Sequence, residues 1–575
     1  MIYQIVLPFS AVFPSESPRE IKEYLTGISK ETLITAGCFF LGFKTYGSKY
    51  ADPSAFLKML YGSDKIQIEK AEQNIKAFLA ENRYVTEYPT IPNVVSSLQF
   101  FEIAYKLEAA EQTKTQKQSE LDILKAYLLL NEKLSERNRT VEQIEQHYQG
   151  HMRVVANHLF YQFDRFDLTN YDNDKLYSTQ LLRACMFFEF LSQREDCALL
   201  LNEFYRNFEV KDYEEYLKRV LTLSFAVINA ENEAQTDIVL ENEPEQASFL
   251  DRLAINNAEI IDDFDFKAIR ANPIYKVSEG IYRIISPIFA IELIYNGLVW
   301  KFKEVYDKMP EQDRPKSFQG LKTLDFSEKF VLNSVLPKYF DERHMQKNGQ
   351  ELDKNYQGAP DYYVRNLNSI ILFESKDILI NAEVKQSVDF LKIEQALKEK
   401  LYKKSNGRSN AVMQLIKSIE KILSKKQAFD NDYSLDEVTI SPVIILHNRM
   451  FNNAGLNKFI NFWFQQELQI LKNKGFKISN VRPLVIIDID TLIFNQDLFS
   501  DRTLDFESCL HEYQTKYVGY GDPNSVQHPI AHQFSPTAYK ESLLPFANYL
   551  ENKIFQMRRR IIPSEAKLKN TEIFK

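Results

Sequence analysis

Three charged side chains, Asp361, Glu374 and Lys376, stand at the ends of two short apolar stretches of the sequence. Asp361 follows Pro360, whereas Glu374 and Lys376 flank a single serine directly after the run IILF. Two carboxylates at one sheet edge raise each other's pKa unless a cation lies between them, and Mg²⁺ or Mn²⁺ prefers such oxygen ligands. A lysine beside the metal can position a water and stabilise charge on a phosphate. The residues are therefore those of a metal-dependent active site, unless they are only charged strand ends.

Two neighbouring strands must position these side chains. The segments DYYVR (361–365) and SIILFES (369–375) predict strands joined by a short turn. Because side chains alternate along a strand, Glu374 and Lys376 share one face and Ser375 points to the other. We expect a bend or bulge between the strands to bring Asp361 near Glu374.

A helix upstream offers a further carboxylate. The segment FSEKFVLNSV predicts a short helix that ends at Pro337. Glu328 precedes Val331, Leu332 and Val335 by three, four and seven residues, so it falls on the apolar side of that helix. A carboxylate that faces a core is costly unless it is paired or bound to a metal. We therefore expect Glu328 to reach the same site.

These residues together resemble the motif of the PD-(D/E)xK nuclease superfamily, which has the restriction-endonuclease-like fold. The resemblance covers roughly residues 265–500. It implies a Mg²⁺- or Mn²⁺-dependent endonuclease that hydrolyses phosphodiester bonds, in DNA more often than in RNA. It further implies that Asp361 and Glu374 ligate the metal, that Lys376 orients the water, and that Glu328 completes the metal shell or holds a second ion.

A second triplet of the same kind is an alternative. Glu383-Val384-Lys385 lies close behind the first triplet and could replace Glu374 and Lys376. It follows ILIN, which is a weaker strand pattern than SIILF, so the first triplet is preferred.

A lysine-rich segment follows the proposed active strand. Residues 392–426 contain ten Lys or Arg against three Glu. The overall net charge of −8 does not suggest a nucleic-acid binder, but the balance is acidic over residues 1–320 and basic beyond them. A basic face can hold phosphate backbone without reading sequence, although lysine-rich helices are often only solvated surface. The residues expected to contact the backbone are Lys398, Lys403, Lys404, Arg408 and Gln414.

Gln414 also matches a feature of some branches of this nuclease superfamily. Some branches of the superfamily carry a glutamine and a tyrosine on the helix after the active strand, and Gln414 matches the glutamine. Ser418 stands where the tyrosine would be, so the branch is left open.

The length of 575 residues predicts more than one domain. Residues 1–230 predict an all-helical domain, residues 231–262 an acidic linker, and residues 263–575 an α/β nuclease domain with a C-terminal extension, in which a mixed sheet is flanked by helices. In that last part, residues 282–300 predict strands that turn at Asn296-Gly297. Further strands are expected at 438–446 and 482–490, and helices at 388–402, 411–424 and 455–473.

Several classes of protein are disfavoured. The four cysteines are far apart and include no CxxC pair, which speaks against a zinc or disulfide framework and favours the reducing cytoplasm. No segment predicts a membrane span. We expect a nuclease in defence against foreign DNA such as phage, whose helical part senses, recruits or restrains through a protein partner or a second copy. An RNase of the same fold, or a catalytically inactive interaction protein, is the alternative.

Overall fold

The computed structural model describes residues 4–557, apart from positions 43–52, 62–63, 82–87, 109, 136–139, 162, 164, 170–171, 230–235, 257–264, 355, 357, 388 and 520–535. It is mostly helical and divides into two compact units. Unit 1 comprises Met1–Arg139, Leu168–Leu181 and Glu203–Glu304, and unit 2 comprises Thr140–Asp167, Leu182–Asn202 and Val305–Lys575. Two segments between positions 140 and 202 therefore belong to the unit that holds the central sheet, although the sequence placed them in the helical N-terminal domain.

Unit 1 combines helices with two small sheets. β1 (Gln4–Val6) pairs in parallel with β2 (Tyr88–Thr90) inside the region predicted to be all-helical, and β3 (Asp237–Val239), β5 (Ile281–Ile284) and β4 (Ile274–Ser278) form an antiparallel sheet in that order. Its helices are α1 (Phe9–Val12), α2 (Ile21–Leu25), α3 (Lys30–Gly42), α4 (Pro53–Tyr61), α5 (Lys65–Glu81), α6 (Val94–Lys106), α7 (Gln116–Ser135), α13 (Tyr213–Asn229), α14 (Pro244–Asp251), α15 (Lys267–Ala271) and α16 (Pro287–Glu292). Four helices contain residues of both units: α10 (Phe166–Thr169), α11 (Asn173–Ser192), α12 (Ala198–Phe208) and α17 (Leu298–Lys308).

The structure corrects two expectations in this part of the chain. The described part of the predicted acidic linker, residues 236–256, is folded into β3 and α14, while residues 231–235 and 257–262 lie outside the described residues. The strands predicted over residues 282–300 are wrong beyond Ile284, because the chain continues as α16, a π-helical turn and α17. A run that is apolar at nearly every position has no period to separate a buried strand from a buried helix. Pro287, in the first turn of α16, starts the helix.

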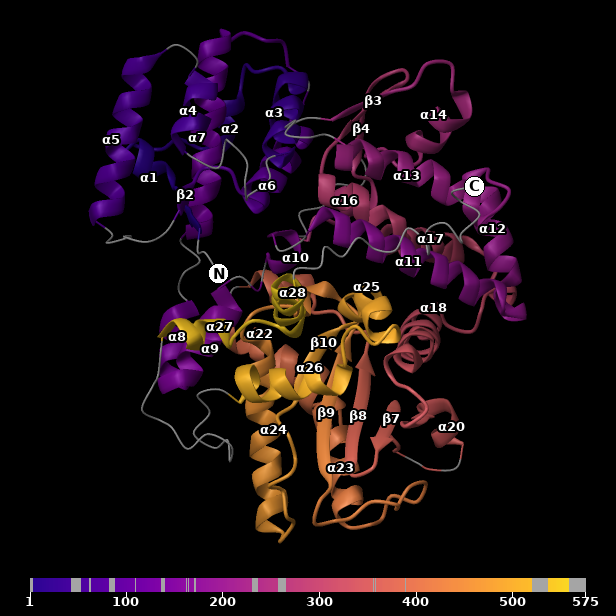
Figure 1. Ribbon diagram of the computed structural model, residues 1–575. Helices are drawn as coiled ribbons and strands as arrows, with labels where there is room; N and C mark the ends of the chain where they lie inside the picture. The colour runs from indigo at the N-terminus through magenta and orange to yellow at the C-terminus, as the bar shows by residue number, and fades with distance from the viewer. Residues whose placement is uncertain are drawn as a thin grey trace. The chain divides into compact units, whose positions relative to one another are not determined.

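Unit 2 is built around a five-stranded mixed sheet of order β10-β9-β8-β7-β6 (Figure 1). β6, β7 and β8 are antiparallel neighbours, whereas β8, β9 and β10 run parallel to one another. The strands are β6 (Met345–Asn348), β7 (Tyr362–Asn366), β8 (Ser369–Lys376), β9 (Thr439–Leu446) and β10 (Val485–Asp488). The four strands predicted from position 361 onward are confirmed, β10 being shorter than expected, and with them the mixed sheet of the C-terminal half.

Helices surround this sheet, and those predicted at 388–402, 411–424 and 455–473 are confirmed. The first is α22 followed by a π-helical turn at Lys398–Tyr402. The helices of unit 2 are α8 (Thr140–His147), α9 (Gly150–Tyr161), α18 (Phe318–Gly320), the π-helix Leu321–Val331, α19 (Leu332–Val335), α20 (Gly349–Asp353), α21 (Ala382–Gln386), α22 (Phe390–Leu397), α23 (Ala411–Leu423), α24 (Leu456–Asn473), α25 (Ile489–Ser500), α26 (Phe506–Tyr513), α27 (Pro536–Glu541) and α28 (Phe546–Gln556). No helix among the described residues of either unit is long and apolar enough to cross a bilayer.

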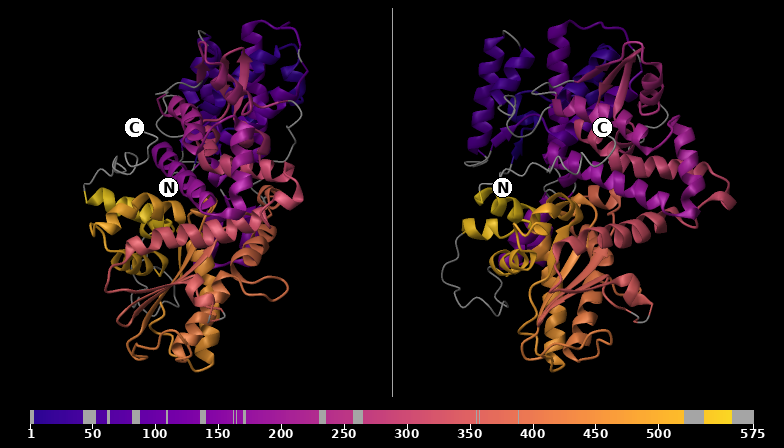
Figure 2. Two further views of the ribbon diagram at one scale, coloured as in Figure 1. Left: turned by 90° about the vertical axis from the view of Figure 1, so that its right-hand side faces the viewer. Right: turned by 45° about the vertical axis from the view of Figure 1, so that its right-hand side comes forward.

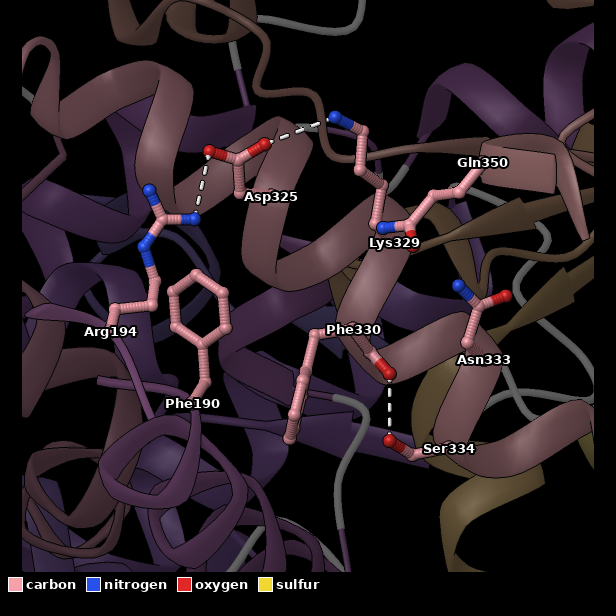
Figure 3. A pocket seen from close by; sticks show the side chains of 8 residues that line it. All are labelled: Phe190, Arg194, Asp325, Lys329, Phe330, Asn333, Ser334 and Gln350. Carbon is pink, nitrogen blue, oxygen red and sulfur yellow. Dashed lines mark hydrogen bonds and ion pairs between the residues drawn. The ribbon is translucent and has the colours of Figure 1, made fainter. Parts of the chain in front are cut away.

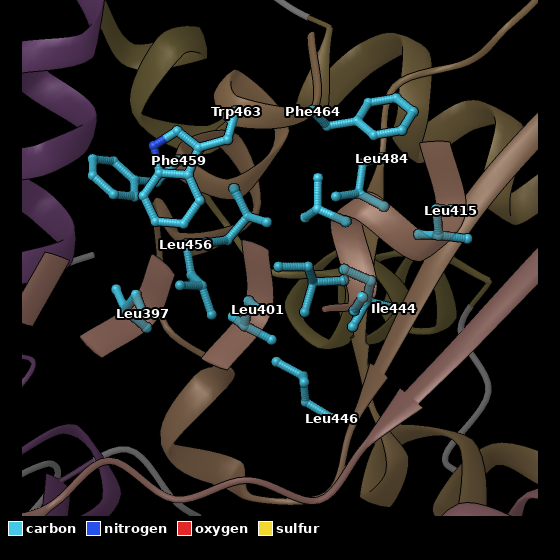
Figure 4. Packing of buried hydrophobic residues seen from close by; sticks show 14 of the residues in the cluster. Leu397, Leu401, Leu415, Ile444, Leu446, Leu456, Phe459, Trp463, Phe464 and Leu484 are labelled. Carbon is cyan, nitrogen blue, oxygen red and sulfur yellow. The ribbon is translucent and has the colours of Figure 1, made fainter. Parts of the chain in front are cut away.

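Alternate residues of β8 pack into two different cores. Ile370 and Leu372 join the buried cluster formed with α22, α23 and α24, which includes Trp463 (Figure 4). Phe373 points to the other face, where its ring stacks on Phe506 of α26 at a centroid distance of 6.3 Å. Helices thus cover both faces of the sheet (Figure 2). The burial fixes β8 in place, and the alternation sets the directions of the residues at its end.

Candidate active site

The β7–β8 hairpin sets Asp361 opposite Glu374. Tyr362 pairs with Phe373 and the register is regular to the turn, so extending it by one residue places Asp361 across from Glu374. The expected bulge is absent from the paired part of β7 and β8, and the chain bends at Asp361, directly before β7. The two-residue turn is made by Leu367 and Asn368, with Leu367 at φ 52°, and it fixes the register without any irregularity.

Lys376 bonds to both carboxylates on this face. Its Nζ lies 3.2 Å from Glu374 Oε2 and 3.3 Å from Asp361 Oδ2. The same Asp361 oxygen also accepts a hydrogen bond from the backbone N–H of Ser375 at 2.7 Å. The sequence therefore predicted correctly that these three side chains converge.

The surroundings of the cluster raise the pKa values of its buried groups. Glu374 is 1% exposed, and its Oε1 has no hydrogen-bond partner among the described residues. Burial and the neighbouring charge of Asp361 raise the pKa of Glu374 well above its ordinary value. Burial opposes the charge of Lys376, but the carboxylates of Asp361 and Glu374 outweigh it and raise the lysine pKa. The lysine is therefore a fixed positive charge, and Glu374 holds its proton more tightly than an exposed glutamate.

Glu328 reaches the cluster from the π-helix Leu321–Val331. Its Oε1 accepts a hydrogen bond of 3.2 Å from the backbone N–H of Asp377, the residue directly after β8. Burial raises the pKa of Glu328 to about 7, although the charge of Lys376 opposes the rise. The prediction that this glutamate turns inward is thus confirmed, in a π-helix rather than the α-helix whose period led to it.

Asp377 fastens the π-helix to the end of β8, a contact that the sequence analysis missed. Its side chain is 2% exposed, lies 2.6 Å from Lys322 Nζ and accepts a hydrogen bond from Ser327 Oγ at 2.5 Å. Burial opposes the charge, but Lys322 prevails and lowers the pKa of Asp377. The residue thus holds Lys322 and Ser327 of the π-helix through its side chain and Glu328 through its own N–H. Its place directly after the triplet was the only available signal.

The opposite face of β8 carries a second buried polar contact. Ser375 Oγ and His447 Nε2 lie 2.8 Å apart, and burial lowers the pKa of His447 to about 3, so the imidazole is neutral. Arg183 donates to the carbonyl of His447 at 3.2 Å and to Asp490 at 3.1 Å. Ser375 and His447 are both buried. The contact therefore fixes the end of β8 and presents no accessible nucleophile.

The second triplet is not part of this cluster. Glu383 and Lys385 lie on helix α21 rather than on a strand. Glu383 is exposed, and Lys385 is buried with its Nζ 3.7 Å from Asp167. The structure therefore favours Glu374 and Lys376 as the residues that accompany Asp361.

The residues predicted to bind the nucleic-acid backbone lie on α23 and in the segment between α22 and α23. Lys403, Lys404 and Arg408 are exposed in a tight turn, where the N–H of Lys404 donates to the carbonyl of Arg408 at 3.0 Å. Lys398 is paired with Glu394 at 2.6 Å, and Gln414 is half-buried on α23. Among the described residues, no hydrogen bond or ion pair joins any of them to Asp361 or Glu374.

The donor set of the cluster fits a hard divalent cation in its chemistry. Asp361 and Glu374 present carboxylate oxygens on one face, and the orphaned Oε1 of Glu374 is a buried acceptor that a cation would satisfy. Within the described residues, however, no group of three or more His, Cys, Asp and Glu side chains is arranged to hold a metal ion. In this arrangement the positive charge of the Lys376 ammonium group partly balances the carboxyl groups of Asp361 and Glu374. Comparison with known proteins finds no matching family model, no matching curated protein and no matching solved structure.

Proposed function

We propose that this protein is a divalent-metal-dependent endonuclease of the PD-(D/E)xK type, with DNA as its preferred substrate. The observation that carries the proposal is the convergence of Asp361, Glu374 and Lys376 on one face of the β7–β8 hairpin, with Glu328 entering from a neighbouring helix. The two carboxylates can bind a metal ion. The lysine bonded to them can orient a water and stabilise the negative charge that develops on the phosphate.

Each residue has a defined task in this proposal. Asp361, Glu374 and Glu328 would hold Mg²⁺ or Mn²⁺, which when bound supplies Lewis-acid activation of water and of the scissile phosphate. Lys376 keeps its proton because its pKa is raised, so it donates hydrogen bonds to the attacking water or a phosphate oxygen and does not act as a base. The burial of Glu374 excludes water from its side of the site and strengthens these charge interactions.

The exposed cations Lys403, Lys404 and Arg408 support a nucleic-acid substrate, because such side chains bind phosphate backbone without sequence readout. A role in defence against foreign DNA such as phage rests on analogy with nucleases of this superfamily that are fused to helical domains. In that role unit 1 would sense a trigger or bind a protein partner.

Removal of the metal is expected to abolish cleavage. Supercoiled plasmid, single-stranded DNA and RNA are incubated with the full chain in Mg²⁺, and again in excess EDTA. Asp361→Asn should match the EDTA sample, because it removes a carboxylate that bonds Lys376 and faces Glu374. Glu383→Gln, an exposed glutamate of the second triplet, is the matched control and should cut like the wild type.

Cleavage that persists in EDTA and in Asp361→Asn would refute the site. Cleavage of RNA alone would select the RNase alternative. Intact DNA and RNA in every sample would favour an inactive nuclease fold used for interaction.

Metal binding is expected to strengthen as the pH rises through neutrality. The raised pKa of about 7 means that Glu328 is largely protonated below pH 7, and a cation must displace that proton before it binds. Titration calorimetry with Mn²⁺ should show affinity increasing several-fold between about pH 6 and about pH 8. Glu328→Gln should bind Mn²⁺ more weakly and with a shallower pH dependence, the remainder being due to Glu374. An unchanged slope in Glu328→Gln would remove Glu328 from the metal site.

A further inference from the structure

A cleft of about 460 Å³ opens in unit 2 beside the carboxylate cluster (Figure 3). Its walls come from three places in the chain: the end of α11, the π-helix with α19, and α20. A volume of this size is within the range of sites that hold small molecules or single groups of a larger ligand. No residue of the cleft belongs to the cluster itself.

Two walls of the cleft are nevertheless neighbours of the cluster in sequence and in space. Lys329 and Phe330 directly follow Glu328 on the π-helix. On the other side, the N–H of Gly349 donates to the carbonyl of Asp361 at 2.8 Å, and Gln350 is the next residue. A side chain at Gly349 would lie 3.1 Å from the Cα of Asp361, so the two backbones are in direct contact. A ligand in the cleft is therefore placed next to the residues that face the scissile bond.

The lining of the cleft combines aromatic, amide and cationic groups (Figure 3). The rings of Phe190 and Phe330 lie 5.4 Å apart at 60°, and Phe330 is only half-buried. Phe330 also stacks on Phe326 at 6.0 Å and 21°, so a planar ligand would pack against the part of the Phe330 ring that stays exposed and would not be sandwiched. The side-chain amides of Asn333 and Gln350 have no hydrogen-bond partner among the described residues, which leaves both donors and acceptors free for a polar edge.

The charge of the lining suits a single phosphate. Arg194 is held by Asp196 through bonds of 2.9 and 2.8 Å and lies 3.4 Å from Asp325. Lys329 has one carboxylate contact, to Asp325 at 3.1 Å, and a partly exposed ammonium group. Because Asp196 outside the lining compensates Arg194, the phosphate contact falls to the partly exposed Lys329, which suits one phosphodiester and is weak for a polyphosphate.

We propose that this cleft holds one unpaired nucleotide of the substrate strand next to the scissile phosphate. Its base packs on Phe330, its polar edge bonds to the amides of Asn333 and Gln350, and its phosphate meets Lys329. A paired base inside a duplex has both faces covered by stacking, so the cleft selects single-stranded, frayed or flipped nucleotides. This inference rests on the proposed nuclease function, and it narrows the substrate to nucleic acid with an unpaired nucleotide at the cut.

Binding without cleavage tests the cleft independently of the chemistry. A fluorescein-labelled single-stranded DNA is titrated with the full chain in EDTA and followed by anisotropy. Phe330→Ala should weaken binding about tenfold or more, because base–aromatic stacking contributes that much per base. Phe330→Tyr should retain binding and shows that the helix still folds. Phe555→Ala, which removes a ring that is 83% exposed on α28, is the matched control and should bind like the wild type.

The position of the nucleotide is tested with Mg²⁺ and strands that carry one abasic site, moved one nucleotide at a time. At one position beside the cut, an abasic site should slow cleavage by the wild type about tenfold. The same abasic site should have little further effect on cleavage by Phe330→Ala. Three results would overturn the assignment of the cleft even if the enzyme cleaves DNA. They are unchanged DNA binding in Phe330→Ala, equal cleavage at every abasic position, and competition by adenosine monophosphate that is as strong as competition by the strand. Binding that depends on Phe330 in a chain that never cuts would refute the nuclease and leave the cleft as a nucleotide site.

Discussion

Replacement of Lys376 by methionine is expected to lower the rate of DNA cleavage at least about 10²–10³-fold, the loss seen when one preorganised charge-stabilising group is removed from an active site. Methionine keeps much of the length of the side chain and removes its charge. The ammonium group contacts both Asp361 and Glu374, at 3.3 and 3.2 Å. In the proposed mechanism, its loss would leave the attacking water and the phosphate without this hydrogen-bond donor, and the two carboxylates would repel each other.

Lys385→Met is the matched control, because it makes the same change in a buried lysine of the second triplet. That lysine pairs with Asp167 and lies on α21, outside the β7–β8 hairpin, so the variant should lose stability and keep its rate per folded molecule. Rates are compared under single-turnover conditions at saturating enzyme, with DNA affinity measured separately by anisotropy. A Lys376→Met enzyme within about tenfold of the wild type, or a larger loss in Lys385→Met, would contradict the assignment.

The hairpin was predictable because two separate patterns agree on it. The run SIILF can be buried on both faces, which suits the central β8, and the short turn joins it to β7, although the regular register that sets Asp361 opposite Glu374 was not foreseen. The choice between the two triplets followed from the weaker strand pattern of ILIN, and the structure shows that its last residue, Asn381, caps α21 by accepting from the N–H of Glu383.

Other parts depend on contacts that no local pattern contains. A π-helix differs from an α-helix in the carbonyl that accepts from each N–H. The spacing of apolar residues around Glu328 is compatible with both helix types, so it could not distinguish between them. The ion pair of Asp377 with Lys322 joins residues far apart in the chain, so it could not be read from either segment alone. The cleft at Phe330 likewise needs the approach of α11 and α20, and the membership of residues 140–167 and 182–202 in unit 2 follows from contacts with distant parts of that unit.

Replacement of Glu374 by glutamine is expected to abolish cleavage and yet stabilise the fold at neutral pH. The carboxyl is 1% exposed, and its Oε1 has no partner among the described residues, so its ionised form is held at a cost of about 1–3 kcal/mol. Glutamine has the same shape and no charge, and its amide can donate to the carboxylate of Asp361. Lys376 keeps its pairing with Asp361 at 3.3 Å, so no isolated charge is left behind. The glutamate expected to be needed for cleavage thus lowers the stability of the fold, which is a common trade-off at functional sites.

The pH dependence identifies the cause of that gain. The pKa of Glu374 is higher in the folded chain than in the unfolded chain. At a pH between these two pKa values, the folded chain therefore keeps a proton on Glu374 that the unfolded chain has released. Wild-type stability therefore falls as the pH rises through this window, and Glu374→Gln removes the fall. In metal-free buffer, the difference in thermal unfolding midpoint between Glu374→Gln and wild type should be near zero at about pH 4.5 and grow toward pH 8. Glu383→Gln, at an exposed glutamate, should show no such growth, and a Glu374→Gln midpoint below that of wild type at pH 8 would mean that the ionised carboxylate stabilises the fold instead.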